Sequence, residues 1–502
     1  MIKILSAVFF LVTVMHTNLS TAEPQAKIDV SNSKNYALDF KKFTNLAEQG
    51  VASAQFDLAN VYYDGKGVAE DRELAASWYR KAAEQGHLVS QFRLGQMLAD
   101  GMGVEKDEAQ AVQWYRKAAV QGYGDAQHNL GVMYANGQGI EKDEAQATYW
   151  YRKAAEQGDI SSQINLGNMY ANGQGVAKDD TQAFYWYLKA AQSGDSDLQY
   201  NIGFFYAEGR GVDKNVVKAY RWFLKAAKQG QALAQYRLGD IYEYGDGAAK
   251  DQLMAIKWYR ASAEQGDARA QLKMGNYYQG KDDVRAVEWY LKAAVQDKAG
   301  AQYNLGVMYS NGSGVEQDEA TANQWYLKAA NNGYVHAQFT LGDRYLNGYS
   351  LSHDDTQAAV WFSKAAAQGH AEAQNNLAVM YVNGQGVEQS DEQAYKWFSK
   401  AAAQGSALAQ CSLGLLYKNG QGVNQDMVQA VQWLRKAAEQ GNALAQSNLG
   451  IMYSMGQGVP QNKEQGIYWM KMAAEQGDIE AQQNLKKVTT TTMVITYDPS
   501  KQ

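Results

Sequence analysis

The sequence has 502 residues, of which 46% are hydrophobic and 20% are charged, the proportions of an ordinary folded protein. Its 47 Lys and Arg against 53 Asp and Glu give a net charge of −6, so it lacks the basic excess that a nucleic-acid-binding protein carries. The single cysteine, Cys411, excludes an intramolecular disulfide, and we interpret it as a small buried helix residue rather than a reactive thiol.

The chain opens with the pattern of a secretory signal peptide. Lys3 precedes an apolar run over Ile4–Met15, and Ser20-Thr21-Ala22 supplies the small residues of a cleavage site. The run is short for a membrane-spanning helix. We therefore expect a signal peptide over 1–22, cleaved after Ala22, with an uncleaved membrane anchor as the alternative. No cysteine follows the run, which argues against a lipid anchor.

An internal repeat of 36 residues governs the rest of the chain. Every tryptophan falls on one lattice with steps of 36, except for one step of 31 between Trp258 and Trp289. A glutamine recurs on the same spacing from Gln55 to Gln482. Such recurrence indicates a solenoid in which each unit packs on its neighbours.

The unit Ala126–Gly158 predicts two antiparallel helices. An apolar stripe that includes Leu130 marks the first helix, which the glycine-rich segment Asn136–Ile140 ends. Asp143 begins the second helix, and we expect it to form a capping box with Gln146. The other units place Asp, Asn or Ser at the position of Asp143.

A glycine lies inside the predicted first helix of ten units, Gly131 among them. Glycine in a helix costs ~1 kcal/mol relative to alanine, so we expect the partner helix or a large ring to lie against it. The tryptophans are predicted to join neighbouring helix pairs. Truncation of any one of them to alanine should therefore cost about 3–5 kcal/mol.

The pattern resembles the Sel1-like repeat family, relatives of the tetratricopeptide repeats. In one unit the resemblance is carried by Ala126-Gln127, Leu130-Gly131, Tyr134, Gly137-Gln138-Gly139 and Trp150–Ala155. It implies an all-α fold, a right-handed α/α superhelical solenoid of about twelve helix-pair repeats that acts as a protein-interaction scaffold. Bacterial members are often exported and tied to envelope complexes or host contact. Some relatives pair cysteines within each repeat, and this chain lacks those cysteines.

The resemblance and the repeat divide the mature chain into five segments. We expect a linker over 23–34, a capping helix over 35–50, the solenoid over 51–477, a second capping helix over 478–488 and a loose tail over 489–502.

Two units depart from the pattern. The unit over 271–302 is five residues short, lacks the G-x-G-V loop and ends in Gln296-Asp297. We interpret it as a possible hinge between two half-solenoids, with a harmless loop deletion as the alternative. A second loop is altered without a change of length, at Gly348–Ser352.

No catalytic or metal-binding motif stands out. The histidines show no metal-ligand spacing, and the N-G-Q-G turns lack the G-K-[ST] ending of a phosphate loop. We therefore expect no enzymatic activity, no cofactor and no metal site.

One row of side chains is the candidate binding site. The residue after each repeated glutamine lies almost opposite the core stripe of its helix, yet in nine units it is aromatic, histidine or aliphatic. In tetratricopeptide-like solenoids this face lines the concave groove, so we expect the row to anchor a partner. The alternative is that the rings pack between successive first helices. The position five residues after the glutamine continues the same face and contributes Phe204. The predicted groove residues are Phe56, Phe92, His128, Tyr200, Phe204, Tyr236, Tyr303 and Phe339.

These observations predict an exported scaffold or adaptor that binds a protein or peptide partner in an envelope complex or in host interaction. A periplasmic location is expected, with secretion as the alternative, and no nucleic-acid partner. Two other functions are kept as alternatives: an enzyme acting on cell-wall material on the same scaffold, and a purely structural envelope spacer.

Overall fold

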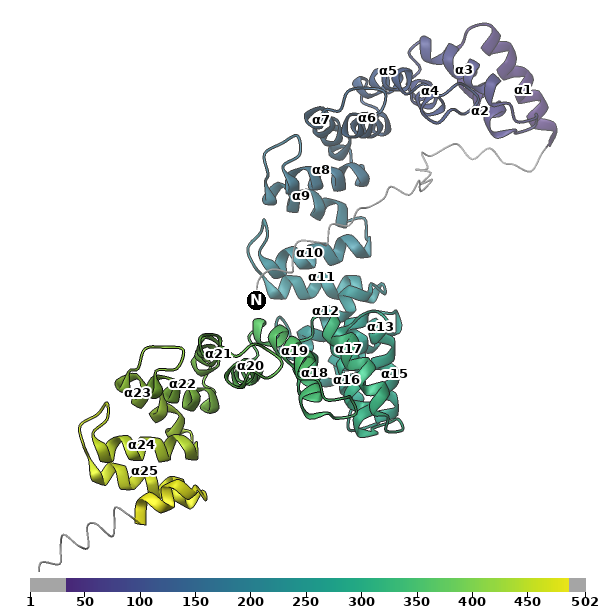
Figure 1. Cartoon of the computed structure of the whole chain (residues 1–502). Helices are drawn as coiled ribbons and strands as arrows, with labels where there is room; N and C mark the ends of the chain where they lie inside the picture. Colours follow the sequence, from purple (N-terminus) through teal and green to yellow (C-terminus); the bar gives the residue numbers. More distant parts are fainter. Residues whose placement is uncertain (1–32, 487–502) are drawn as a thin grey trace, which may run out of the picture. The chain divides into compact units, whose positions relative to one another are not determined.

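The computed structural model describes residues 33–486, and all regular secondary structure within that range is helical (Figure 1). The chain divides into two compact units, the first ending at Asn215 and the second beginning at Val216. The predicted signal peptide, most of the predicted linker and the predicted tail lie outside the described residues. The predicted all-α repeat solenoid is confirmed.

Helix α1 (Ser33–Glu48) precedes a strict alternation of first and second helices, and a short helical stretch over 479–486 follows the last pair. The first helices are α2 (Ala52–Asp64), α4 (Leu88–Asp100), α6 (Gly124–Asn136), α8 (Ile160–Asn172), α10 (Ser196–Glu208), α12 (Ala232–Tyr244), α14 (Ala268–Tyr278), α16 (Ala299–Asn311), α18 (Val335–Asn347), α20 (Ala371–Asn383), α22 (Ala407–Asn419) and α24 (Ala443–Met455). The second helices are α3 (Arg72–Glu84), α5 (Glu108–Val120), α7 (Glu144–Glu156), α9 (Asp180–Ala191), α11 (Val216–Lys228), α13 (Gln252–Glu264), α15 (Asp283–Ala294), α17 (Glu319–Asn331), α19 (Asp355–Ala367), α21 (Asp391–Ala403), α23 (Met427–Glu439) and α25 (Lys463–Glu475).

Glycine and aspartate define the helix ends, as the α6–α7 pair illustrates. Gly137 takes the left-handed conformation (φ 72°) and donates its N–H to the carbonyl of Met133, which stops α6. The Asp143 carboxylate accepts from the N–H of Gln146 at 2.9 Å and so caps α7. The predicted capping box is only half formed, because the N–H of Asp143 donates to the Tyr134 carbonyl instead of to Gln146.

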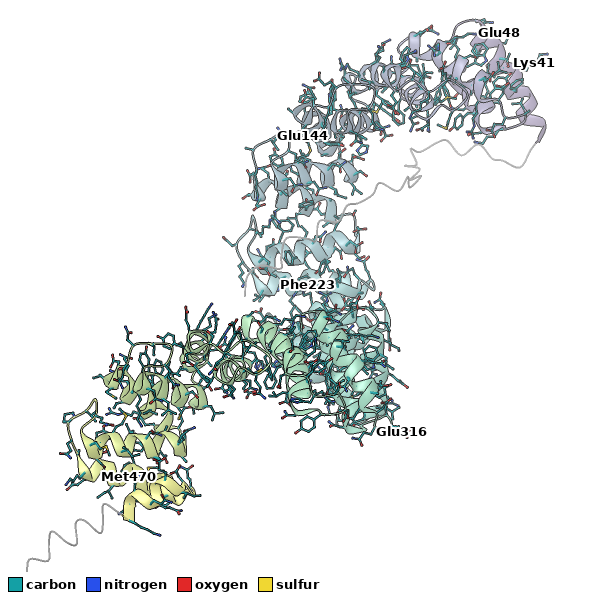
Figure 2. All side chains as sticks on the ribbon, in the orientation of Figure 1. Lys41, Glu48, Glu144, Phe223, Glu316 and Met470 are labelled. Carbon is teal, nitrogen blue, oxygen red and sulfur yellow. The ribbon has the colours of Figure 1, made fainter. Side chains whose placement is uncertain are left out.

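The side chain that packs between the two helices of a pair belongs to the residue that directly follows the tryptophan in the sequence. Tyr151 is 5% exposed, and its ring atoms lie 2.8 Å from the place that a Cβ would take at Gly131. This contact confirms the expectation that a large ring lies against the helical glycine. In the last two pairs the same position is aliphatic, so that Leu434 faces Gly414, and Met470, labelled in Figure 2, faces Gly450.

The tryptophans pack against the core of the preceding pair, as expected, but most do so only partly. Trp325 contacts the cluster that contains Tyr290 of the preceding pair and Met308 of its own first helix, α16. Only Trp114, Trp150, Trp186 and Trp361 are buried, and the other eight are half-buried. The burial on which the uniform truncation cost rests does not hold for the half-buried members, so we expect a smaller cost there, because part of the indole stays in solvent in the folded state.

A glutamine pair also joins successive repeats. The buried Gln127 side chain donates to the carbonyl of Ala119 at the end of the preceding second helix, at 3.0 Å. Its own carbonyl oxygen accepts from Gln157 at 2.7 Å. The Ala119 carbonyl also accepts the N–H of Gly122 at 3.0 Å, so the glutamine adds a second bond to an acceptor at the helix terminus. Equivalent pairs recur along the chain, for example Gln410 with Gln440.

The loop between the two helices of a repeat packs against the second helix of the preceding repeat. A Cβ at Gly175 would collide with the backbone carbonyl of Glu144, labelled in Figure 2, at the start of the preceding second helix. The altered loop places Ser350 in the left-handed region (φ 54°) instead of a glycine, and its carbonyl accepts from the buried Asn323 at 3.2 Å.

The boundary between the two units falls in the repeat of 196–231 and not in the short repeat that the sequence suggested as a hinge. In the short repeat, α14 is two residues shorter than the other first helices, and a turn in which Asp282 N–H donates to the Tyr278 carbonyl replaces the loop. Tyr290 is fully buried against Gly275, so the helix pair keeps the usual core contact.

Candidate interaction surface

We define the first-helix face by the side chains two and five positions after the buried glutamine in each first helix. At a 100° rotation per residue, these positions lie on the side of the helix opposite the buried glutamine, and some of them reach a tyrosine hydroxyl of the second helix. In α8 they are Asn165 and Asn168, and in α10 they are Asn201 and Phe204. This face and the adjoining aromatic row one position after the glutamine make up the candidate surface.

The predicted aromatic row lies at the seam between successive first helices. Phe92 is buried, with 6% of its surface exposed, whereas the other seven predicted groove residues are half-buried. Phe56 lies 4.8 Å, ring to ring, from His87, the residue that caps the next first helix. Phe339 stacks at 4.6 Å on His370, which holds the equivalent place. The cap of the next first helix therefore covers part of each of these rings.

The same row also contacts the second helix of its own repeat. Phe56 lies 5.9 Å from Tyr79, Tyr236 lies 5.7 Å from Tyr259, and Tyr303 lies 5.6 Å from Tyr326. The alternative that the sequence left open, packing between successive first helices, agrees with the ring contacts to the caps of the next first helices, and binding by the half-buried rings stays a prediction.

His128 replaces the ring contact by polar bonds. Its Nδ1 lies 2.8 Å from the hydroxyl of Ser162 and 3.2 Å from the carboxylate of Asp159, the cap of α8. Burial works to raise the pKa of Asp159, but hydrogen bonds from His128 and Ser162 outweigh it and hold that pKa below its usual value. His128 thus ties α6 to α8 and is occupied within the fold.

The sequence-based prediction missed a row of asparagines two positions after the glutamine. In the first unit these are Asn129, Asn165 and Asn201, at steps of 36 residues. Within the described chain, the side chains of Asn165 and Asn201 make no hydrogen bond, whereas Asn129 interacts with the Tyr115 hydroxyl and works to lower its pKa, against the stronger effect of burial. Their regular spacing was visible in the sequence, but whether the amides were occupied was not.

In the second unit, the corresponding amides are bonded internally. Asn304 donates to Asn276 at 3.1 Å, and Asn376 accepts from Asn375 at 3.3 Å. Asn448 is buried, accepts from Lys418 at 2.8 Å and donates to the carbonyl of Leu444 at 3.0 Å.

The first helices of the two units also differ in the number of charged residues of each sign. Those of the first unit carry six carboxylates and one cation: Asp57, Asp64, Asp100, Asp125, Asp197 and Glu208 against Arg93. Those of the second unit carry four carboxylates and five cations: Asp240, Glu243, Asp343 and Glu372 against Arg237, Arg269, Lys273, Arg344 and Lys418. The first unit therefore presents an acidic layer of first helices.

The second helices carry their tryptophans beneath lysines. Lys117 lies 3.8 Å from the ring centre of Trp114, and the lysine three residues after the tryptophan takes a similar place in most repeats. The lysines cover indole surface that the partly buried rings would otherwise expose. A cavity of about 700 Å³ lies on this side, lined in part by Val112, Arg116 and Gln121.

Residues 33–486 contain no cluster of three histidine, cysteine or acidic side chains arranged to hold a metal ion. None of the helices in that range is both long enough and apolar enough to span a membrane. Burial raises the pKa of the Cys411 thiol to about 11, so the interpretation of Cys411 as a small buried residue agrees with its 3% exposure.

Comparison with known proteins assigns the fold to a family. The Sel1 repeat family matches the chain twelve times in succession over residues 52–297 and 299–478. A crystal structure described as c5321, a protective antigen present in uropathogenic Escherichia coli strains displaying an SLR fold, is 36% identical, covers 88% of this chain and 97% of its own, and has a TM-score of 0.68. A Sel1 repeat protein from Oxalobacter formigenes is 32% identical, covers 62% of this chain and 94% of its own, and has a TM-score of 0.50. No curated protein matches the chain.

The fold and the surface together define an all-α repeat solenoid of the kind commonly used for protein–protein interaction. The chain belongs to the Sel1 repeat family.

Proposed function

We propose that this Sel1 repeat protein is an exported scaffold or adaptor that binds a protein or peptide partner on its first-helix face, in an envelope complex or in contact with a host. The observation that carries the proposal is that Asn165 of α8 and Asn201 of α10 keep all their hydrogen-bonding capacity within the described residues. Polar groups that the fold does not use are available to a partner.

Two further observations support export. The N-terminal sequence has the pattern of a signal peptide. The E. coli relative is described as a protective antigen, a description that agrees with export. A periplasmic or secreted location is therefore part of the proposal.

Site-specific cross-linking in the source cells tests the proposal. A photoreactive residue at Ser161, exposed on α8, should yield a cross-linked protein adduct. The matched position is Tyr149, 50% exposed on the second helix α7, and it should yield none. Adducts of equal yield at the two positions would contradict recognition by the first-helix face. Fractionation of the same cells should recover the mature chain, beginning at Glu23, outside the cytoplasm, and recovery of the uncleaved chain in the cytoplasm would overturn export.

A further inference from the structure

We infer that the first-helix face of α6, α8 and α10 binds an extended, basic polypeptide segment by its backbone, with Asn165 and Asn201 as the backbone contacts. The inference rests on the proposed function and gives the chemistry of the partner. It is carried by three features of the first unit: the unoccupied amides, their spacing and the surrounding charge.

The amides are available to a ligand. Asn201 is exposed and Asn165 is half-buried, and neither bonds to another group between residues 33 and 486. A third amide, Asn168, accepts the hydroxyl of Tyr187 at 2.5 Å and makes no other bond in that range, so its N–H groups remain to donate. Each asparagine offers donors and an acceptor in one plane, which is the complement of a peptide group.

The spacing of the amides fits an extended chain. Packed helices lie about 8–10 Å apart. A polyproline II segment advances about 3.1 Å per residue with three residues per turn. Its peptide groups therefore repeat on one side of the chain about every 9 Å. Asn165 and Asn201 hold the same position on consecutive first helices. Helix α9 packs against both α8 and α10, and in the proposed complex the two asparagines meet peptide groups that repeat along one side of the extended segment.

The charge around the amides selects basic side chains. Helix α8 carries no charged residue, whereas α6 carries Asp125 and α10 carries Asp197 and Glu208. Asp125 and Glu208 take part in no ion pair in the described part of the chain. Carboxylates on both sides of the neutral helix attract Lys and Arg and repel acidic segments. Half-buried Val132 and Phe204 offer apolar contact to the aliphatic stems of such residues.

The test is fluorescence anisotropy with the intact mature chain and a labelled peptide of four Lys-Thr-Pro triplets, a composition that favours the extended conformation. We expect binding at low ionic strength, and binding at least about tenfold weaker for a peptide of Glu-Thr-Pro triplets. The double variant Asn165→Ala/Asn201→Ala should weaken binding of the lysine peptide by about tenfold. The matched variant Asn304→Ala/Asn376→Ala, in the second unit, should bind as the wild type does.

Three results would overturn the inference: no binding of the lysine peptide, equal binding of the glutamate peptide, or unchanged binding by the Asn165→Ala/Asn201→Ala variant. The last would mean attraction by charge alone. The melting temperature of each variant serves as the folding control, since alanine favours a helix more than asparagine does. If the lysine peptide does not bind while position 161 still cross-links to a partner, the inferred chemistry of the partner is wrong and the proposed function stands. If neither binding nor cross-linking is observed, the proposed function is wrong as well.

Discussion

The first helices of the two units share one frame and differ in the use of their polar groups. In the first unit, α8 and α10 leave the amides of Asn165 and Asn201 unbonded, and the first helices carry an excess of carboxylates. In the second unit, the equivalent amides of Asn304, Asn376 and Asn448 are bonded within the fold. A repeat protein can therefore keep one core and assign different tasks to the outer positions of its repeats.

The last three first helices extend this contrast toward apolar chemistry. Five positions after the glutamine they carry Val379, Leu415 and Ile451, where α2, α8 and α14 carry asparagine. The ring behind that position changes with it. Tyr79 and Tyr187 donate their hydroxyls to Asn60 and Asn168, respectively, whereas Phe398, Leu434 and Met470 have no hydroxyl to donate. In these five repeats, the polarity of the outward position therefore changes together with that of the buried position behind it.

Truncation of the shared ring should give the largest effect and the same effect in both units. Tyr151→Ala and Tyr290→Ala each remove a buried ring, so each should lower the free energy of unfolding by about 3–5 kcal/mol. Urea titration of the intact chain measures this loss. Trp325→Ala is the control and should cost less, because that ring is half-buried. A larger loss for Trp325 would contradict the assignment of the core position to the tyrosine.

The next largest effect on stability is expected in the second unit, in the buried hydrogen-bond network around Arg344. Arg344 is buried, stands where most first helices have an aliphatic residue, and donates to Glu319 at 2.6 Å, Asn323 at 2.9 Å and Ser310 at 2.9 Å. Arg344→Met leaves Asn323 without this partner and should cost roughly 1–3 kcal/mol.

The double variant Arg344→Met/Asn323→Val restores the apolar pair that other repeats use, and its unfolding free energy should recover most of that loss. Equal stability of the single and double variants would show that the polar network is not the source of the cost.

Asp159 offers a pH test confined to the first unit. Its pKa is lowered in the folded state, so its contribution to stability is present above about pH 4, the usual carboxyl pKa, and is lost as the pH falls through the lowered value. Asp159→Asn keeps the helix cap but should cost about 1 kcal/mol at neutral pH and almost nothing in strong acid.

The control for that test is Asp195→Asn, which caps the next first helix without a histidine beside it at the corresponding place, where Ile164 stands. Urea titrations of both variants at the two pH values provide the comparison. A loss for Asp159→Asn that persists unchanged in acid would rule out the ionised carboxylate as its cause.

The smallest expected effect is a difference in melting temperature between variants of hydrogen-bonded and unbonded asparagines. Asn165→Ala should leave the melting temperature unchanged or slightly raised, because no bond is lost and alanine has the higher helix propensity. Asn448→Ala loses bonds to Lys418 and Leu444 and should cost about 1 kcal/mol. Differential scanning calorimetry resolves the sign, and equal shifts for the two variants would break the proposed contrast between the units.

The sequence predicted the repeat, the two helices per repeat, the caps and the glycine contact, because each depends on local spacing. The capping box at Asp143 and the uniform role of the tryptophans were not predicted correctly. The N–H of Asp143 has a competing acceptor at Tyr134, and the indole is placed by the packing of two repeats. Both depend on contacts between elements, which periodicity along one chain does not contain.

The candidate site was predicted less well for the same reason. The aromatic row was identified by its unexpected position opposite the core stripe, yet rings such as Phe92 and Phe339 contact the next repeat as well as their own. The asparagine row has the same spacing as the aromatic row. Only the structure distinguishes Asn201, which is unbonded, from Asn448, which is buried and bonded.

The most direct measurement of the central claim replaces peptide bonds of the ligand by esters. An ester keeps the extended shape and the lysines but removes the backbone N–H that an asparagine oxygen would accept. Fluorescence anisotropy should show that the ester peptide binds the wild-type chain about tenfold more weakly than the amide peptide, and that the Asn165→Ala/Asn201→Ala variant does not distinguish the two. Equal affinities of both peptides for the wild-type chain would contradict recognition of the backbone.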